Sequence, residues 1–171
     1  MTPLHKLYAK LCRELAQSEH WAIVHSRREV RRLGDVAPAK ALLDLGAHAA
    51  SMRPRLSALM STRQPLGVLI ARTLGELFSA VRDLVFDRLI DLERSYRATL
   101  LGFHHGIAVA RLLREVAARL GDQHMVGYCE DMLTERVPLL EAAEREVTWF
   151  VQRPTKAIRS GLAAALEPER S

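Results

Sequence analysis

The chain has 171 residues, of which 49% are hydrophobic and only 5% aromatic, and Leu, Ala, Arg and Glu dominate. This length suits one domain that buries most of its apolar surface without disulfide bonds or structural metal ions. The composition is typical of a helical bundle. The formal charge of +5 is small and is spread along the chain, so we expect a solvated basic surface and no nucleic-acid partner.

The same sequence argues against a membrane protein and a secreted protein. No alternating run bounded by turn residues predicts a strand, so the predicted fold class is all-α. The N-terminus MTPLHKLYAK is charged where a signal peptide would be apolar, and the most apolar run, 66–70, stops at Arg72 and Glu76. Cys12 and Cys129 lack metal-ligand spacing, which indicates reduced, buried thiols. We therefore expect a cytoplasmic protein without a membrane partner.

The first helix is predicted to begin after Thr2, because Pro3 fits the first helical position, and to end before Gly34, which supplies a left-handed residue. Four arginines in the run SRREVRR are expected to form one exposed face, which solvates the helix and offers a less favoured phosphate-binding alternative. The expected buried stripe is Leu4, Tyr8, Leu11, Leu15, Ser18 or Glu19, Ala22, Ser26, Val30 and Leu33.

The second helix is predicted to begin near Pro38, and Pro54 should kink it or end it early, because proline removes a helical hydrogen bond. Its expected stripe is Leu42, Leu45, His48 or Ala49, Met52, Leu56 and Leu59. After the interruption at 61–67, residues 68–86 are apolar over a wide arc. We predict a self-association surface there, most simply in an isologous homodimer, with lipid binding as the rival explanation.

The third core helix is predicted over 89–120. The preceding segment from 68 is either a crossover helix, with a break near 86–88 that we favour, or the first half of one very long third helix. Glu93 is the one carboxylate on its apolar stripe, where an ion must be paired, ligated or protonated, and the structural alternative is an ion pair with Arg97. The other stripe members are Leu89, Tyr96, Leu100, Phe103, Ile107, Ala110, Leu113, Ala117 and Leu120.

The fourth helix should begin after Asp122, run to about Val151 and bend at Pro138. Its expected inward residues are Leu133, Val137, Leu140, Val147 and Val151. We therefore predict a helical bundle domain at 1–153 and a C-terminal extension with a short helix at 154–171. A four-helix bundle with a long crossover between helices two and three has the ferritin-like topology.

Short patterns in the second half resemble small ferritin-like proteins, especially the YciF-type stress-response group. The matching pieces are Glu93 with Tyr96, then Leu120, Gly121 and Asp122, then Glu130, Asp131 and Glu135. The first half is similar in plan, with Glu19 and His48 at ligand positions. The resemblance implies that Glu19, His48, Glu93 and Glu135 converge as metal ligands, with iron or manganese as the cofactor.

The departures from that family are equally specific. Ferritin-like di-iron sites use two glutamates and two Glu-x-x-His pairs, and the chain contains no Glu-x-x-His. Four ligands would remain where six are needed, which indicates a lost or reduced site. Two functions stay open: a non-catalytic bundle that acts through self-association or a protein partner, which we favour, and a metal-binding stress-response protein.

The other histidines offer weaker sites. His25 with Glu29, and Asp44 with His48, have the i,i+4 spacing of a hydrogen-bonded pair or of two ligands to one metal. The adjacent His104 and His105 must point apart, and Gly102 and Gly106 beside them indicate close helix packing. No phosphate loop or nucleophile elbow is present, so we assign no catalytic residue.

Overall fold

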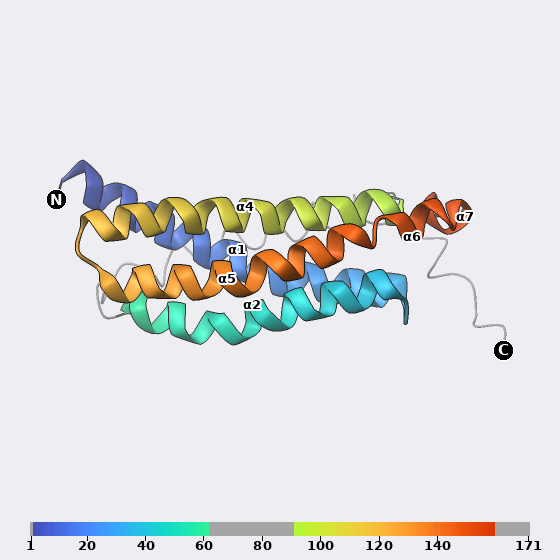
Figure 1. Ribbon diagram of the computed structural model, residues 1–171, viewed down its shortest axis with the longest axis horizontal. Coiled ribbons are helices and arrows are strands. Elements are labelled where there is room, and N and C mark those ends of the chain that lie inside the picture. Colours follow the sequence, from blue (N-terminus) through green and yellow to red (C-terminus); the bar gives the residue numbers. More distant parts are fainter. Residues whose placement is uncertain (1, 62–90, 160–171) are drawn as a thin grey trace, which may run out of the picture.

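The computed structural model describes residues 2–61 and 91–159, and every regular element in these ranges is a helix. Four long helices lie side by side as a bundle (Figure 1), which confirms the all-α prediction. The elements are α1 (Pro3–Leu33), α2 (Ala37–Ser61), α4 (Leu92–Arg119), α5 (Gln123–Arg145), α6 (Thr148–Val151) and α7 (Pro154–Ala157). None of the helices in these ranges has the length and apolar content that a bilayer crossing requires.

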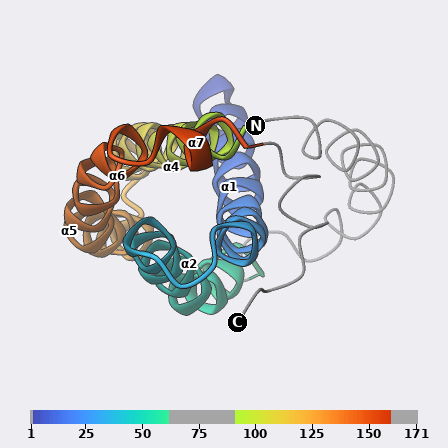
Figure 2. The same ribbon diagram turned by 90° about the vertical axis from the view of Figure 1, so that its right-hand side faces the viewer.

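The order of the helices around the bundle decides which side chains can meet in its centre. α1 packs against α2 and α4, and α5 packs against the same two helices. Figure 2, a view along the bundle, shows α1 and α5 on opposite sides. A side chain of α1 therefore reaches α5 only across the middle of the bundle.

Local signals set the helix ends as the sequence predicts. The Thr2 side chain accepts a hydrogen bond from the His5 N–H, and Gly34 follows α1 with a φ of 76°. Asp122 caps α5 by accepting from the Met125 N–H, after Gly121 has turned the chain with a φ of 71°. These residues satisfy backbone groups that a helix end leaves without partners.

Two expectations about helix ends are wrong: the alternative that Pro54 ends the second helix early, and a fourth helix that runs to about Val151. Pro54 and Pro138 both lie inside continuous helices, so Pro54 does not end α2 early. Packing of the flanking turns against neighbouring helices compensates for one missing hydrogen bond. The fourth helix ends at Arg145, and the residues up to Val151 include the separate short helix α6.

The inward face of α4 agrees with the predicted stripe, whereas that of α5 is rotated from it. Val151 is 77% exposed, and Leu133 and Val137 are only half-buried. The residues of α5 that are buried in the core are Met125, Tyr128, Cys129, Met132, Arg136, Leu140 and Ala143. Arg136 thus occupies a position that the predicted stripe left outside the core.

Close approach of α1 and α4 depends on two glycines, as the sequence indicates. A Cβ atom added at Gly102 would lie 2.1 Å from the Trp21 ring, and one added at Gly106 would lie 2.6 Å from the Ser18 hydroxyl. The adjacent histidines do point apart: His104 contacts Glu144 of α5 at 2.7 Å, and His105 contacts Glu14 at 3.3 Å.

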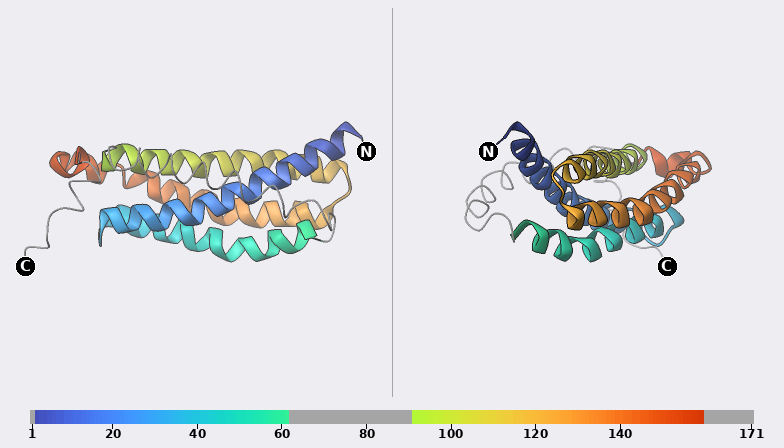
Figure 3. Two further views of the ribbon diagram at one scale, coloured as in Figure 1. Left: turned by 180° about the vertical axis from the view of Figure 1, so that it is seen from behind. Right: turned by 60° about the vertical axis from the view of Figure 1, so that its left-hand side comes forward.

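The two ends of the bundle are closed in different ways. The start of α1 lies at the end where α4 turns into α5 (Figure 3). At the other end the Leu92 N–H donates to the Arg159 carbonyl at 3.1 Å, and α7 packs against α4. The predicted self-association segment at 68–86 and the predicted break at 86–88 lie outside the described residues.

Candidate functional site

Arg136 is the polar centre of the bundle. Its guanidinium donates from Nη1 and Nη2 to the two carboxylate oxygens of Glu19, each at 2.8 Å. Arg136 is 1% exposed and Glu19 is fully buried, so this bidentate pair is excluded from water. Bidentate geometry makes the pair a strong one and fixes the orientation of both side chains. The pair also joins α1 to α5 across the bundle.

His48 of α2 is the third member of this group. The Arg136 Nε donates to His48 Nδ1 at 2.8 Å, which requires that Nδ1 carries no proton. The other ring nitrogen, Nε2, lies 3.2 Å from a carboxylate oxygen of Glu135, whose side chain is 62% exposed. The group therefore runs from the fully buried Glu19 through Arg136 and His48 to a carboxylate at the surface.

The electrostatics of this group keep His48 neutral. Burial lowers the pKa of His48 below its ordinary value, and the positive charge of Arg136 lowers it further, against the opposing effect of Glu135 and Glu19. Neutral imidazole matches the hydrogen bond that Nδ1 accepts. The guanidinium also lies over the Phe103 ring, 5.8 Å from its centre, so an aromatic face covers its remaining side.

Two of the four predicted ligands, Glu19 and His48, contact Arg136, and Glu135 joins them through His48, whereas Glu93 does not belong to this group. Glu93 is half-buried near the start of α4 and forms the ion pair with Arg97 that was the structural alternative. It precedes Phe103 by ten residues. At 1.5 Å per helical residue this places Glu93 about 15 Å along the bundle from the level of Arg136.

The donor set does not fit a divalent metal ion. Both oxygens of Glu19 and Nδ1 of His48 already accept hydrogen bonds from the permanently charged guanidinium of Arg136. In residues 2–61 and 91–159 no group of three or more His, Cys, Asp or Glu side chains could hold a metal ion. A metal would have to displace Arg136 and leave its charge buried without a partner.

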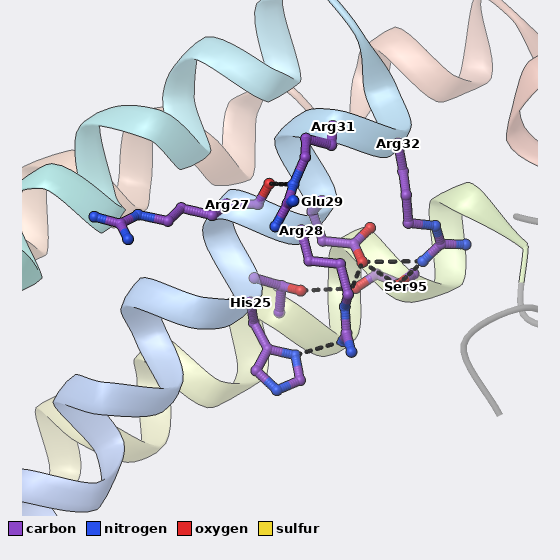
Figure 4. A network of polar contacts seen from close by, with 8 residues as sticks. His25, Arg27, Arg28, Glu29, Arg31, Arg32 and Ser95 are labelled. Atoms are coloured by element: carbon purple, nitrogen blue, oxygen red, sulfur yellow. Dashed lines mark hydrogen bonds and ion pairs between the residues drawn. The ribbon is translucent and has the colours of Figure 1, made fainter. Parts of the chain in front are cut away.

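A second buried carboxylate, Glu29, organises the end of α1 (Figure 4). Its Oε1 accepts from Ser95 Oγ at 2.8 Å and from Arg32 Nη1 at 2.9 Å. Arg28 lies 3.8 Å from the same oxygen and donates to His25 Nδ1 at 2.6 Å. The prediction that all four arginines of this run form one exposed face is therefore wrong: Arg28 and Arg32 turn inward.

The two predicted His–carboxylate pairs are also replaced by other contacts. His25 stacks on the Trp21 ring at 4.2 Å and bonds to Arg28, whereas Glu29 bonds to Ser95 and Arg32. Asp44 is exposed, and His48 contacts Arg136 and Glu135 of α5. Helical spacing predicts which residues share a face, but other partners on the same helix and on neighbouring helices engage these side chains instead.

The cysteines are buried, as predicted. Cys12 and Cys129 belong to the same apolar cluster near the start of α1 and of α5. Burial raises the pKa of Cys129 to about 12, so its thiol stays protonated and is a poor nucleophile. The thiol environment favours a structural role.

Arg136 is the site residue that the sequence reasoning missed. It lies four residues after Met132 and four before Leu140, so it is a charged residue on a helical apolar stripe. The same signal singled out Glu93.

No family model, curated protein or solved structure matches the chain.

Proposed function

We propose that this protein is a non-catalytic ferritin-like bundle that acts through its outer surface, by self-association. The observation that carries this proposal is the arrangement of Arg136, whose described hydrogen bonds all go to Glu19 and His48. Polar groups that pair with one another inside a core stabilise a specific packing, and here both Glu19 oxygens and His48 Nδ1 are engaged by Arg136.

The chain topology supports the ferritin-like part of the proposal. α2 ends at one end of the bundle and α4 begins at the other end (Figure 1). The chain between Ser61 and Leu92 has to connect these two ends, as the long crossover of a ferritin-like bundle does. A simple up-down bundle joins consecutive helices at the same end.

The outward face of α4 supports the self-association part. Leu101 is 69% exposed and Leu112 is 48% exposed, and the exposed Ala108 lies between them at helical spacing. The three residues form an apolar stripe bordered by the His104–Glu144 and His105–Glu14 contacts. Apolar stripes with polar borders are typical of protein interfaces.

Light scattering coupled to size-exclusion chromatography tests the proposal. We expect the wild type to elute as a homodimer, and the double variant Leu101→Lys/Leu112→Lys to elute as a monomer with unchanged helical circular dichroism. Leu43→Lys is the matched control, because Leu43 is 53% exposed on α2, away from this stripe. A wild type that stays monomeric up to its solubility limit would overturn self-association.

A further inference from the structure

A groove on the outside of the bundle runs between α1 and α2. Its lining comes from one face of each helix: Ile23, Arg27, Ala50, Arg53, Pro54 and Ser57. Ile23 is buried and Ala50 is half-buried, so they make an apolar floor, whereas Arg27 and Ser57 are exposed. The groove thus combines an apolar base with polar groups at its edge.

Two positive charges share this groove without a counter-charge. The lining contains no carboxylate, and within the described part of the chain the guanidinium groups of Arg27 and Arg53 form no ion pair or hydrogen bond. Other arginines of α1 and α2 do have a counter-charge: Arg32 pairs with Glu29, and Arg55 pairs with Asp131. Figure 4 shows Arg27 directed away from the Glu29 group. The half-burial of Arg53 makes the missing counter-charge more costly.

The kink-prone Pro54 adds to this local environment. Proline has no N–H, so the Ala50 carbonyl one turn earlier lacks its helical donor at the edge of the same groove. Like charges in one groove repel, and a bound anion removes that repulsion. Guanidinium groups match the oxygens of phosphate in planar, two-bond geometry, and a serine hydroxyl can add a further donor.

We propose that the groove between α1 and α2 binds a small organic phosphate, with Arg27 and Arg53 on the phosphate oxygens and the apolar part of the ligand on Ile23, Ala50 and Pro54. This site is separate from the α4 stripe and does not depend on self-association. The two arginines without a counter-charge favour an anionic ligand, and the apolar floor favours an organic phosphate ester over inorganic phosphate.

Titration of the purified full chain with phenyl phosphate, inorganic phosphate and phenol, followed by isothermal calorimetry, tests this site. We expect saturable binding of phenyl phosphate, weaker binding of inorganic phosphate and none of phenol. Arg27→Gln and Arg53→Gln should each weaken phenyl phosphate binding about tenfold, the loss expected for one charge-assisted hydrogen bond.

Arg13→Gln is the matched control, because Arg13 is an exposed arginine of α1 that does not line the groove. It removes the same net charge and should leave the affinity for phenyl phosphate nearly unchanged. Absence of saturable binding in the wild type, or equal losses in all three variants, would overturn the proposal. Equal affinity for phenyl phosphate and inorganic phosphate would overturn the role of the apolar floor.

Discussion

Tyr8 donates a hydrogen bond of 2.5 Å to Oδ2 of Asp122, across 114 residues of chain. The other oxygen of Asp122 accepts from the Met125 N–H at 3.2 Å and so caps α5. Burial and the contact with Asp122 raise the pKa of Tyr8, which keeps its hydroxyl protonated as a donor. One carboxylate thereby joins the start of α1 to the start of α5.

Asp122→Ala should destabilise the protein more than Tyr8→Phe does. Tyr8→Phe removes one hydrogen bond and should lower the free energy of unfolding by about 1 kcal/mol. Asp122→Ala removes the helix cap as well and leaves the Tyr8 hydroxyl without this acceptor, so we expect a loss of about 2–3 kcal/mol. Urea unfolding followed by circular dichroism measures both, and equal losses would contradict the double role of Asp122.

Breaking the Arg136–Glu19 pair from one side should be strongly destabilising. Arg136→Met leaves the Glu19 carboxylate buried without its partner, and Glu19→Leu leaves the guanidinium in the same position. Each single change should cost about 3–5 kcal/mol in the free energy of unfolding.

The double variant Glu19→Leu/Arg136→Met serves as the control for that experiment. It replaces the pair by apolar side chains of similar length, so it should recover most of the lost stability. Additive losses in the double variant would show that the side chains act through packing and not as an ion pair.

The free energy of unfolding of the wild type should decrease as the pH is lowered, because of His48. The unfolded chain binds a proton near the ordinary histidine pKa of 6.5, whereas the folded site has a lower pKa. The unfolded state therefore binds more protons below about pH 6.5, and the free energy of unfolding decreases there until the folded pKa is also passed. Protonation would place a donor where the Arg136 Nε needs an acceptor.

His48→Asn tests this assignment, because the asparagine oxygen can replace Nδ1 as acceptor but does not titrate. Its unfolding free energy should depend less on pH than that of the wild type between about pH 7 and pH 5. All other residues are the same in the two proteins, so their contributions cancel in the comparison. Parallel pH profiles would exclude His48 as the cause.

Metal ions should not stabilise the fold. We expect no change in Tm when Fe(II), Mn(II) or Zn(II) is added to the wild type, because Arg136 holds the oxygens of Glu19. Glu93→Gln should be nearly neutral, since its ion pair with Arg97 lies at the surface. A metal-dependent rise in Tm that Glu19→Gln abolishes would restore the metal-binding alternative.

Gly102→Ala should destabilise the contact between α1 and α4. The added methyl group would overlap the Trp21 ring, and overpacking of this kind typically costs about 1–3 kcal/mol. Gly127→Ala is the control on α5, where the nearest atom to an added Cβ is 3.9 Å away. That change should stabilise the protein by up to about 1 kcal/mol, since alanine favours a helix more than glycine does. Thermal unfolding should show a lower Tm for Gly102→Ala and an equal or higher Tm for Gly127→Ala than for the wild type.

Local chemistry explains which parts of the fold the sequence predicts well. The helix ends at Thr2, Gly34 and Asp122 depend on contacts within one helical turn. The apolar stripe of α4 is regular over its whole length. Both features can therefore be predicted without tertiary information. The buried face of α5 could not be predicted from the sequence alone, because its apolar arc is wide and the neighbouring helices select which part turns inward. Packing against the neighbouring helices also keeps α2 continuous through Pro54.

The candidate site was predictable only in part. Glu19 and His48 were named from a family resemblance, and the structure brings them together. Their shared partner was not named, because a long arginine on a rotated stripe resembles a solvated surface residue in sequence. Glu93 was singled out by the same kind of signal and lies at the edge of the core, where its own helix provides Arg97.

The diagonal position of Arg136 and Glu19 has a consequence for the order of folding. The pair closes a separation of 117 residues between helices that are not neighbours, so no helical hairpin and no pair of adjacent helices can form it. Its energy becomes available only after α5 has docked opposite α1, so we expect the contact to form late in folding. Such a contact slows unfolding and leaves the folding rate almost unchanged. The bundle can therefore be long-lived once assembled, even if its half-assembled forms are short-lived.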